Sequence, residues 1–76
     1  MSDLPSVSGD EAIAAFETFG FEVDRIKGSH HIMRKPGHRF HLSVPVHGNK
    51  DLKSGTLRSL IRDAGLTVEE FVAALD

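Results

Sequence analysis

The 76-residue sequence contains no cysteine, no tryptophan and no tyrosine. The absence of cysteine excludes disulfides, thiolate metal ligands and a cysteine nucleophile. The sequence also lacks any apolar run near the roughly 18 residues that a membrane helix needs. Its first residues, "MSDLPSVSGD", have neither the basic start nor the apolar stretch of a secretory signal. We therefore expect a cytoplasmic protein, with no membrane partner, whose fold is held together by packing.

What the sequence does have is the composition of an ordinary globular domain, 39% hydrophobic and 26% charged. A chain of this length buries only about 60% of the surface that its unfolded form exposes, so it holds one modest core. We expect a flexible segment at residues 1–8 and a single domain at residues 9–76.

Positive charge is confined to one stretch of the chain. All nine lysines and arginines lie between Arg25 and Arg62, where Asp51 is the one acidic residue, so this stretch carries a net charge of +8. The other ten acidic residues lie outside it. Such segregation predicts a molecule with a basic side that binds phosphate and an opposite acidic side.

Residue periodicity predicts helices that begin at recognisable caps. Ser8 with Glu11, and Thr67 with Glu70, have the spacing of a capping box, and Ser54 is a suitable N-cap for a helix between them. Apolar residues recur at helical spacing after each of these positions. We therefore predict helices at about 9–19 and 55–64, and a short third helix from 67 to the end of the chain.

Alternating residues predict three strands, at 21–27, 29–34 and 39–46. In the third strand, Phe40, Leu42, Val44 and Val46 share one face. Three antiparallel strands with one buried face need helices on that face. The predicted fold is therefore an α+β domain of order α-β-β-β-α, with a three-stranded antiparallel sheet, helices packed on one face, and the other face left to solvent or a partner.

The stretch "KGSHHIMRK" places two adjacent histidines in the second strand, so their side chains must point to opposite faces. Alternate residues of a strand share a face, and each of the two sets contains one apolar residue, Ile32 or Met33. Periodicity alone therefore does not decide which histidine faces the core. Arg34 shares the parity of His30, and arginine is rarely buried without a partner. We therefore expect His30 to face outward. His31 should face the helices and act as a structural ring that hydrogen-bonds a backbone carbonyl.

An exposed imidazole among cations is typical of metal-free acid–base chemistry on RNA, although an exposed histidine without a role is the simpler alternative. The preceding Gly-Ser pair permits a close approach by substrate or backbone. The cations nearest in sequence are Lys27, Arg34 and Lys35, which are equally well read as solvated charges. His47 is a candidate second proton donor or a plain loop residue, and Lys50 and Lys53 are candidates for contacting the RNA backbone.

Other chemistries have less support. A metal site built from His30, His31, His38 and His41 has little support. Because adjacent strand residues face opposite ways, His30 and His31 cannot both bind one metal ion, and His30 with His41 has no third carboxylate or thiolate ligand nearby. No carboxylate pair or Ser-His-Asp spacing indicates hydrolysis of the triad type. We expect no cofactor.

The stretches "GSHHIMRKPG" and "VPVHGNKDLKSGTLRSLIRDAGLTVEEF" resemble the HicA toxins, also called the YcfA-like family, from about Asp10 onward. The resemblance implies a fold like that of double-stranded-RNA-binding domains and the activity of an mRNA interferase, a ribosome-independent endoribonuclease. It implies that His30, the first histidine after Gly-Ser, is catalytic, with Gly28 and Ser29 in support. Met33 and Ser54 stand where an aromatic residue and a proline are frequent, which are structural departures.

The leading hypothesis is therefore the toxin of a type II toxin–antitoxin system, with a non-catalytic RNA-binding module as the alternative. A third alternative is an interaction protein that uses its acidic helices. The resemblance implies two partners, mRNA and a HicB-type antitoxin. We expect the antitoxin to lie over the histidine face and to be acidic opposite Lys27, Arg34 and Lys35. The candidate RNA ligands are Lys27, Arg34, Lys35, His47, Lys50 and Lys53.

Overall fold

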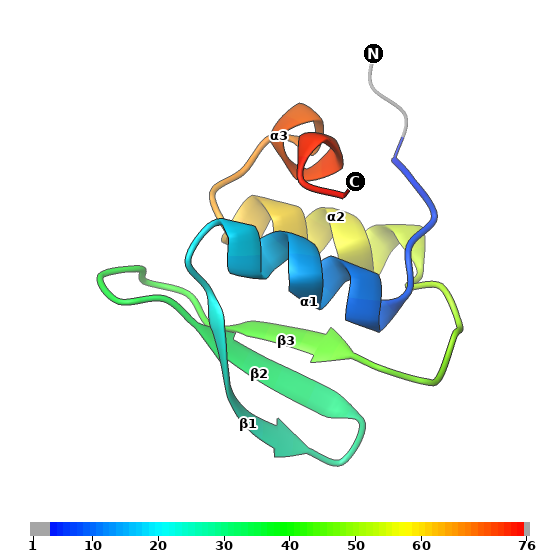
Figure 1. Cartoon of the computed structure of the whole chain (residues 1–76), viewed down its shortest axis with the longest axis horizontal. Coiled ribbons are helices and arrows are strands. Elements are labelled where there is room, and N and C mark those ends of the chain that lie inside the picture. The colour runs from blue at the N-terminus through cyan, green and yellow to red at the C-terminus, as the bar shows by residue number, and fades with distance from the viewer. Residues whose placement is uncertain (1–3, 76) are drawn as a thin grey trace.

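The computed structural model describes residues 4–75, which form the predicted α+β fold. The strands make one antiparallel sheet in the order β1-β2-β3, and the helices lie on one side of it, with α3 farthest from the sheet (Figure 1). No helix in the described part of the chain is long and apolar enough to cross a membrane. The elements are α1 Gly9–Thr18, β1 Glu22–Lys27, β2 His30–Arg34, β3 Leu42–Pro45, α2 Ser54–Asp63 and α3 Val68–Ala73.

Both predicted capping boxes are present. At the start of α1, the Ser8 hydroxyl accepts from the Glu11 amide at 3.2 Å, and the Glu11 carboxylate accepts from the Ser8 amide at 2.8 Å. Thr67 and Glu70 form the same reciprocal pair at the start of α3. These bonds satisfy amide groups that have no partner within the helix, so local sequence fixes where both helices begin.

Two local predictions are wrong. The N-cap of α2 is Lys53, whose side chain makes no capping bond, and Ser54 is the first helical residue. Phe40 was expected on the buried face of the third strand, but β3 begins only at Leu42 and Phe40 is 50% exposed. Phe40 instead lies in the connection between β2 and β3. Its ring is beside that of His38, with centroids 6.3 Å apart.

The core lies between the helices and one face of the sheet. Phe16 of α1 is fully buried, and its ring centroid lies 5.2 Å from that of Phe71 in α3 and 6.2 Å from that of Phe21. Met33 of β2 and Leu42 of β3 are also fully buried and belong to the same cluster. One continuous core therefore joins all three helices to the sheet.

Residues 4–8, which the sequence suggested would be flexible, contact the rest of the domain. The Val7 side chain is buried, and the Val7 carbonyl accepts from the Leu52 amide at 2.8 Å. Ser8 pairs with Asp51 in an isolated antiparallel bridge. This segment therefore holds the loop that precedes α2. The first three residues of the expected flexible segment lie outside the described residues.

A β-bulge in β1 decides which of its side chains face the same way as His30. The pairing register with β2 shifts between Val23 and Arg25, so Asp24 is an extra residue in the strand. Side-chain alternation is reversed beyond a bulge of this kind. Lys27 therefore shares the outer face of the sheet with His30, its pairing partner.

Candidate active site

His30 is the first residue of β2 and follows a two-residue turn formed by Gly28 and Ser29. Gly28 has φ of +63°, as the first position of a type II′ hairpin turn requires, so any other residue there would strain the backbone. The turn places Lys27 and His30 opposite each other on neighbouring strands. Their side chains therefore lie next to each other on one face of the sheet.

The outward orientation of His30 is confirmed. In the pairing of β2 with β3, His31 lies opposite Val44 and Met33 lies opposite Leu42, and Val44 and Leu42 are buried against the helices. His30 has the other parity and is exposed. His31 faces the helices as predicted. The expected hydrogen bond is not made by its Nδ1 atom, which is buried without a partner in the described part of the chain.

The His30 ring contacts Ser43 on the neighbouring strand. Nδ1 of His30 lies 3.2 Å from Oγ of Ser43, and no hydrogen bond from a described residue reaches the ring's Nε2. Ser43 pairs with Ile32 in the sheet, so the contact runs diagonally across the outer face. The sequence placed Ser43 on this face but gave no sign that it contacts the ring.

An open groove of about 650 Å³ lies beside His30. Its walls come from the outer face of the sheet, the loop after β3 and the beginning of α2. The structure thus brings His30 together with three of the predicted RNA ligands from the loop region. The polar residues that line the groove are His30, Ser43, His47, Lys50, Asp51, Lys53 and Thr56.

The other two predicted RNA ligands on β2 and just after it are not part of this groove. Arg34 lies four residues along the strand from His30, which corresponds to about 13 Å. One of its terminal nitrogens, Nη1, is 4.0 Å from Oδ2 of Asp24. Nζ of Lys35 lies 5.6 Å from the centre of the Phe21 ring. These two side chains contact groups of the protein itself.

The two remaining histidines, His38 and His41, lie outside this groove. Nε2 of His38 donates to the carbonyl oxygen of Asp63 at 2.7 Å, and its ring centroid lies 5.1 Å from that of Phe21. His38 therefore has a structural role, which the sequence did not indicate. His41 lines a cavity at the Arg34 end of the sheet and a second cavity, beside α2, with Ser43 and Thr56. Within residues 4–75, no three histidine or carboxylate side chains are grouped as metal ligands.

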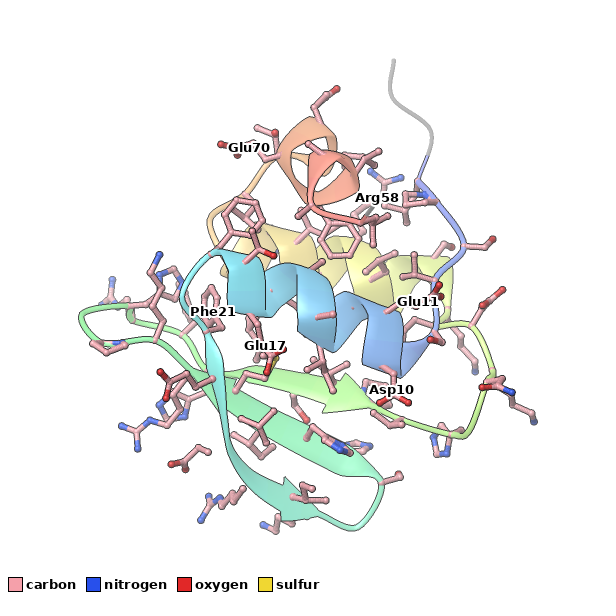
Figure 2. All side chains as sticks on the ribbon, viewed as in Figure 1. Asp10, Glu11, Glu17, Phe21, Arg58 and Glu70 are labelled. Carbon is pink, nitrogen blue, oxygen red and sulfur yellow. The ribbon has the colours of Figure 1, made fainter. Side chains whose placement is uncertain are left out.

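Acidic side chains are concentrated on the helices. Asp10, Glu11 and Glu17 project from α1 and Glu70 from α3 (Figure 2). Arg58 of α2 belongs to the basic stretch of sequence, but it lies on the α3 side of the helices (Figure 2). Some residues of the basic stretch therefore line the groove beside the outer face of the sheet, whereas others, such as Arg58, lie elsewhere on the domain.

The element order and the three-stranded sheet with its helices on one face define the class of the double-stranded-RNA-binding-domain-like folds. Residues 9–66 match the family described as HicA toxin of bacterial toxin–antitoxin, so the chain belongs to the HicA toxin family. It is thus the toxin of a toxin–antitoxin system, in a family of RNase-type activity whose members have an antitoxin partner. Comparison with curated proteins gives no match.

Proposed function

We propose that the chain is a metal-independent endoribonuclease that cleaves mRNA, with His30 as a proton-transfer group. The observation that carries the proposal is an exposed imidazole at an open groove lined by two lysines and a second histidine. Imidazole exchanges protons near neutral pH, and lysines neutralise phosphate. The groove thus combines the two kinds of group that RNA cleavage without a metal needs.

In the proposed reaction, the ribose 2′-oxygen attacks the adjacent phosphorus, and the bond from phosphorus to the 5′-oxygen breaks. The 2′-hydroxyl loses a proton and the departing 5′-oxygen gains one, so the products end in a 2′,3′-cyclic phosphate and a 5′-hydroxyl. His30 performs one of these proton transfers, which contributes a factor of about 10²–10⁴ in rate. RNA supplies its own nucleophile, held next to the phosphorus by the chain itself.

The nearby cations hold the phosphate and stabilise the negative charge of the phosphorane. Lys27 lies opposite His30 in the sheet, while Lys50 and Lys53 line the groove together with His47, the candidate second proton donor. Fixed cations of this kind stabilise the transition state because they are already in place when the charge develops. Arg34 and Lys35, at the far end of β2, are assigned to RNA beyond the scissile linkage.

Gly28 and Ser29 support the site through the backbone. Gly28 provides the positive φ of the turn that places Lys27 opposite His30. The Ser29 carbonyl accepts from the Val46 amide at 2.7 Å, which ties the turn to the chain immediately after β3. The two residues therefore fix the position of the proposed catalytic ring relative to the loop that carries the other groove residues.

The antitoxin is proposed to be a HicB-type protein that lies over the outer face of the sheet and excludes RNA. Since His30 is exposed there, inhibition requires only that this face be covered. The partner should be acidic where it meets Lys27, Arg34 and Lys35, and also opposite the two lysines of the groove. Those cations, with Pro45 and Leu52 in the lining of the groove, would provide most of the docking energy. We therefore expect His30→Ala to weaken antitoxin binding far less than cleavage.

The test is cleavage of an end-labelled mRNA fragment in the presence of a metal chelator. We expect cleavage to persist, to leave 2′,3′-cyclic phosphate ends, and to stop at a linkage whose 2′-hydroxyl has been removed. Cleavage at that deoxy linkage, or loss of all activity with chelator, would contradict the proposal. RNA binding without any cleavage would favour the non-catalytic binding module, which a basic groove alone also fits.

A further inference from the structure

Ser43 is the residue that contacts the ring of the proposed catalytic histidine. Its Oγ lies 3.2 Å from Nδ1 of His30, and both side chains are exposed on the outer face of the sheet. The two residues belong to neighbouring paired strands, β3 and β2. Because the sheet fixes both backbones, the positions of the two residues relative to each other are constant.

The contact also distinguishes the two nitrogens of the ring. The partner of one ring nitrogen decides which nitrogen is left for chemistry. With Nδ1 beside Ser43, Nε2 is the nitrogen that has no hydrogen-bond partner among residues 4–75. A serine hydroxyl can accept from an Nδ1–H group, and it keeps this bond when Nε2 gains a proton, because Nδ1 carries a hydrogen in the imidazolium as well.

The other polar groups around the ring do not compete for Nδ1. Lys27 faces His30 from β1, and His47, Lys50, Asp51 and Lys53 line the groove from the loop after β3 and the start of α2. In the described chain, none of them forms a hydrogen bond with the ring. These groups can therefore hold substrate, while the orientation of the ring depends on Ser43.

We propose that Ser43 is a positioning residue that holds the His30 ring with Nε2 available to the RNA; this inference rests on the proposed function. In the neutral ring, Nδ1 carries the hydrogen and donates to Ser43 Oγ, while the lone pair of Nε2 accepts the proton of the 2′-hydroxyl. The resulting imidazolium keeps the same Nδ1 donor. The ring therefore takes up the proton without turning, and Ser43 exchanges no proton with the substrate.

The kinetic test compares Ser43→Ala and Ser43→Thr with the parent chain. Loss of one neutral hydrogen bond should lower kcat about 3- to 10-fold. KM should stay unchanged, because the hydroxyl holds the ring and not the phosphate. Threonine keeps a hydroxyl and should restore most of kcat. The matched control is Ser59→Ala, since Ser59 accepts from Arg62 on α2 and should leave both constants unchanged.

A second measurement does not depend on activity. Nitrogen-15 NMR of the histidine side chains, with the ring neutral, should show His30 mainly as the Nδ1–H tautomer in the parent and shifted toward Nε2–H in Ser43→Ala. Equal tautomer populations in the two proteins, or equal kcat values, would overturn the positioning role. A parent chain that cleaves no RNA would instead reject the proposed function, and the NMR comparison would still decide whether Ser43 sets the tautomer.

Discussion

Strand β2 begins at His30 and ends at Arg34, and its two ends have different surroundings. At the first end, an open groove of about 650 Å³ is lined by a second histidine and two lysines. At the other end, Arg34 and Lys35 line a smaller cavity of about 410 Å³, but their side chains also contact a carboxylate and an aromatic ring of the protein itself. Charge that lines an open groove is available to an external phosphate, whereas charge that already has a partner is less so. Closeness in sequence to His30 therefore does not identify the cations that act with it.

Replacing one histidine at each end should give the largest difference. His30→Ala should lower the single-turnover rate of RNA cleavage by a factor of about 10²–10⁴, because it removes a proton-transfer group. His41→Ala is the matched control, since His41 is also exposed and lines the cavity at the Arg34 end and another beside α2, but not the groove of His30. We expect its rate to equal that of the parent. Similar losses in both variants would remove the distinction between the ends.

Gly9→Ala should disturb the His30 end through packing. A methyl group on Gly9 would meet the carbonyl oxygen of Pro45 and Cγ2 of Val46, the residues that lead into the loop of His47. Such overpacking costs about 1–3 kcal/mol in the free energy of unfolding, which urea denaturation measures. Gly55→Ala in α2 adds a methyl group in open space and should stabilise by up to about 1 kcal/mol. Equal stabilities would contradict the close approach at Gly9.

Paired removal of two cations tests the electrostatic difference between the ends. Lys50 and Lys53 changed together to alanine should weaken binding of an uncleavable deoxy-substituted RNA. Their loss should also reduce the slope of log affinity against log salt by about 0.7 for each lost phosphate contact. The double change of Arg34 and Lys35 to alanine should reduce this slope less, because both side chains have partners within the protein. A larger loss in the second variant would place the main RNA contacts at the wrong end.

The smallest effect is expected at the ion pair of the far end. Asp24 and Arg34 are 4.0 Å apart, and their side chains are 43% and 57% exposed. Exposed pairs of this kind contribute about 0–1 kcal/mol. Asp24→Asn should therefore change the free energy of unfolding by less than about 1 kcal/mol, and the difference should shrink further in high salt. A greater loss that salt does not reduce would show that Asp24 does more than pair with Arg34.

The sequence was sufficient for the order of the elements and for the orientation of His30. Both follow from local rules, because capping boxes mark helix starts and an unpaired arginine avoids the core. It did not predict the bulge at Asp24, which decides that Lys27 faces the same way as His30. Bulges depend on how two strands pair, and neither strand carries that information alone.

The sequence also did not predict the groove. Lys50 and Lys53 approach His30 because the loop after β3 returns past the end of the sheet, where residues 4–8 hold it through the Val7 carbonyl and the Leu52 amide. These contacts join segments far apart in the chain. Helical and strand periodicity describe single elements, so they contain no signal for such contacts.

The most direct test of the account is to observe which end of β2 meets RNA. The deoxy-substituted RNA would be titrated into the chain while NMR follows the ring signals of the histidines. We predict that the signals of His30 and His47 shift together with increasing RNA, because both rings line the groove. The signals of His38, which is bonded to Asp63, and of His41 should shift little. Shifts at His41 with His30 unchanged would contradict the assignment of the groove as the active site.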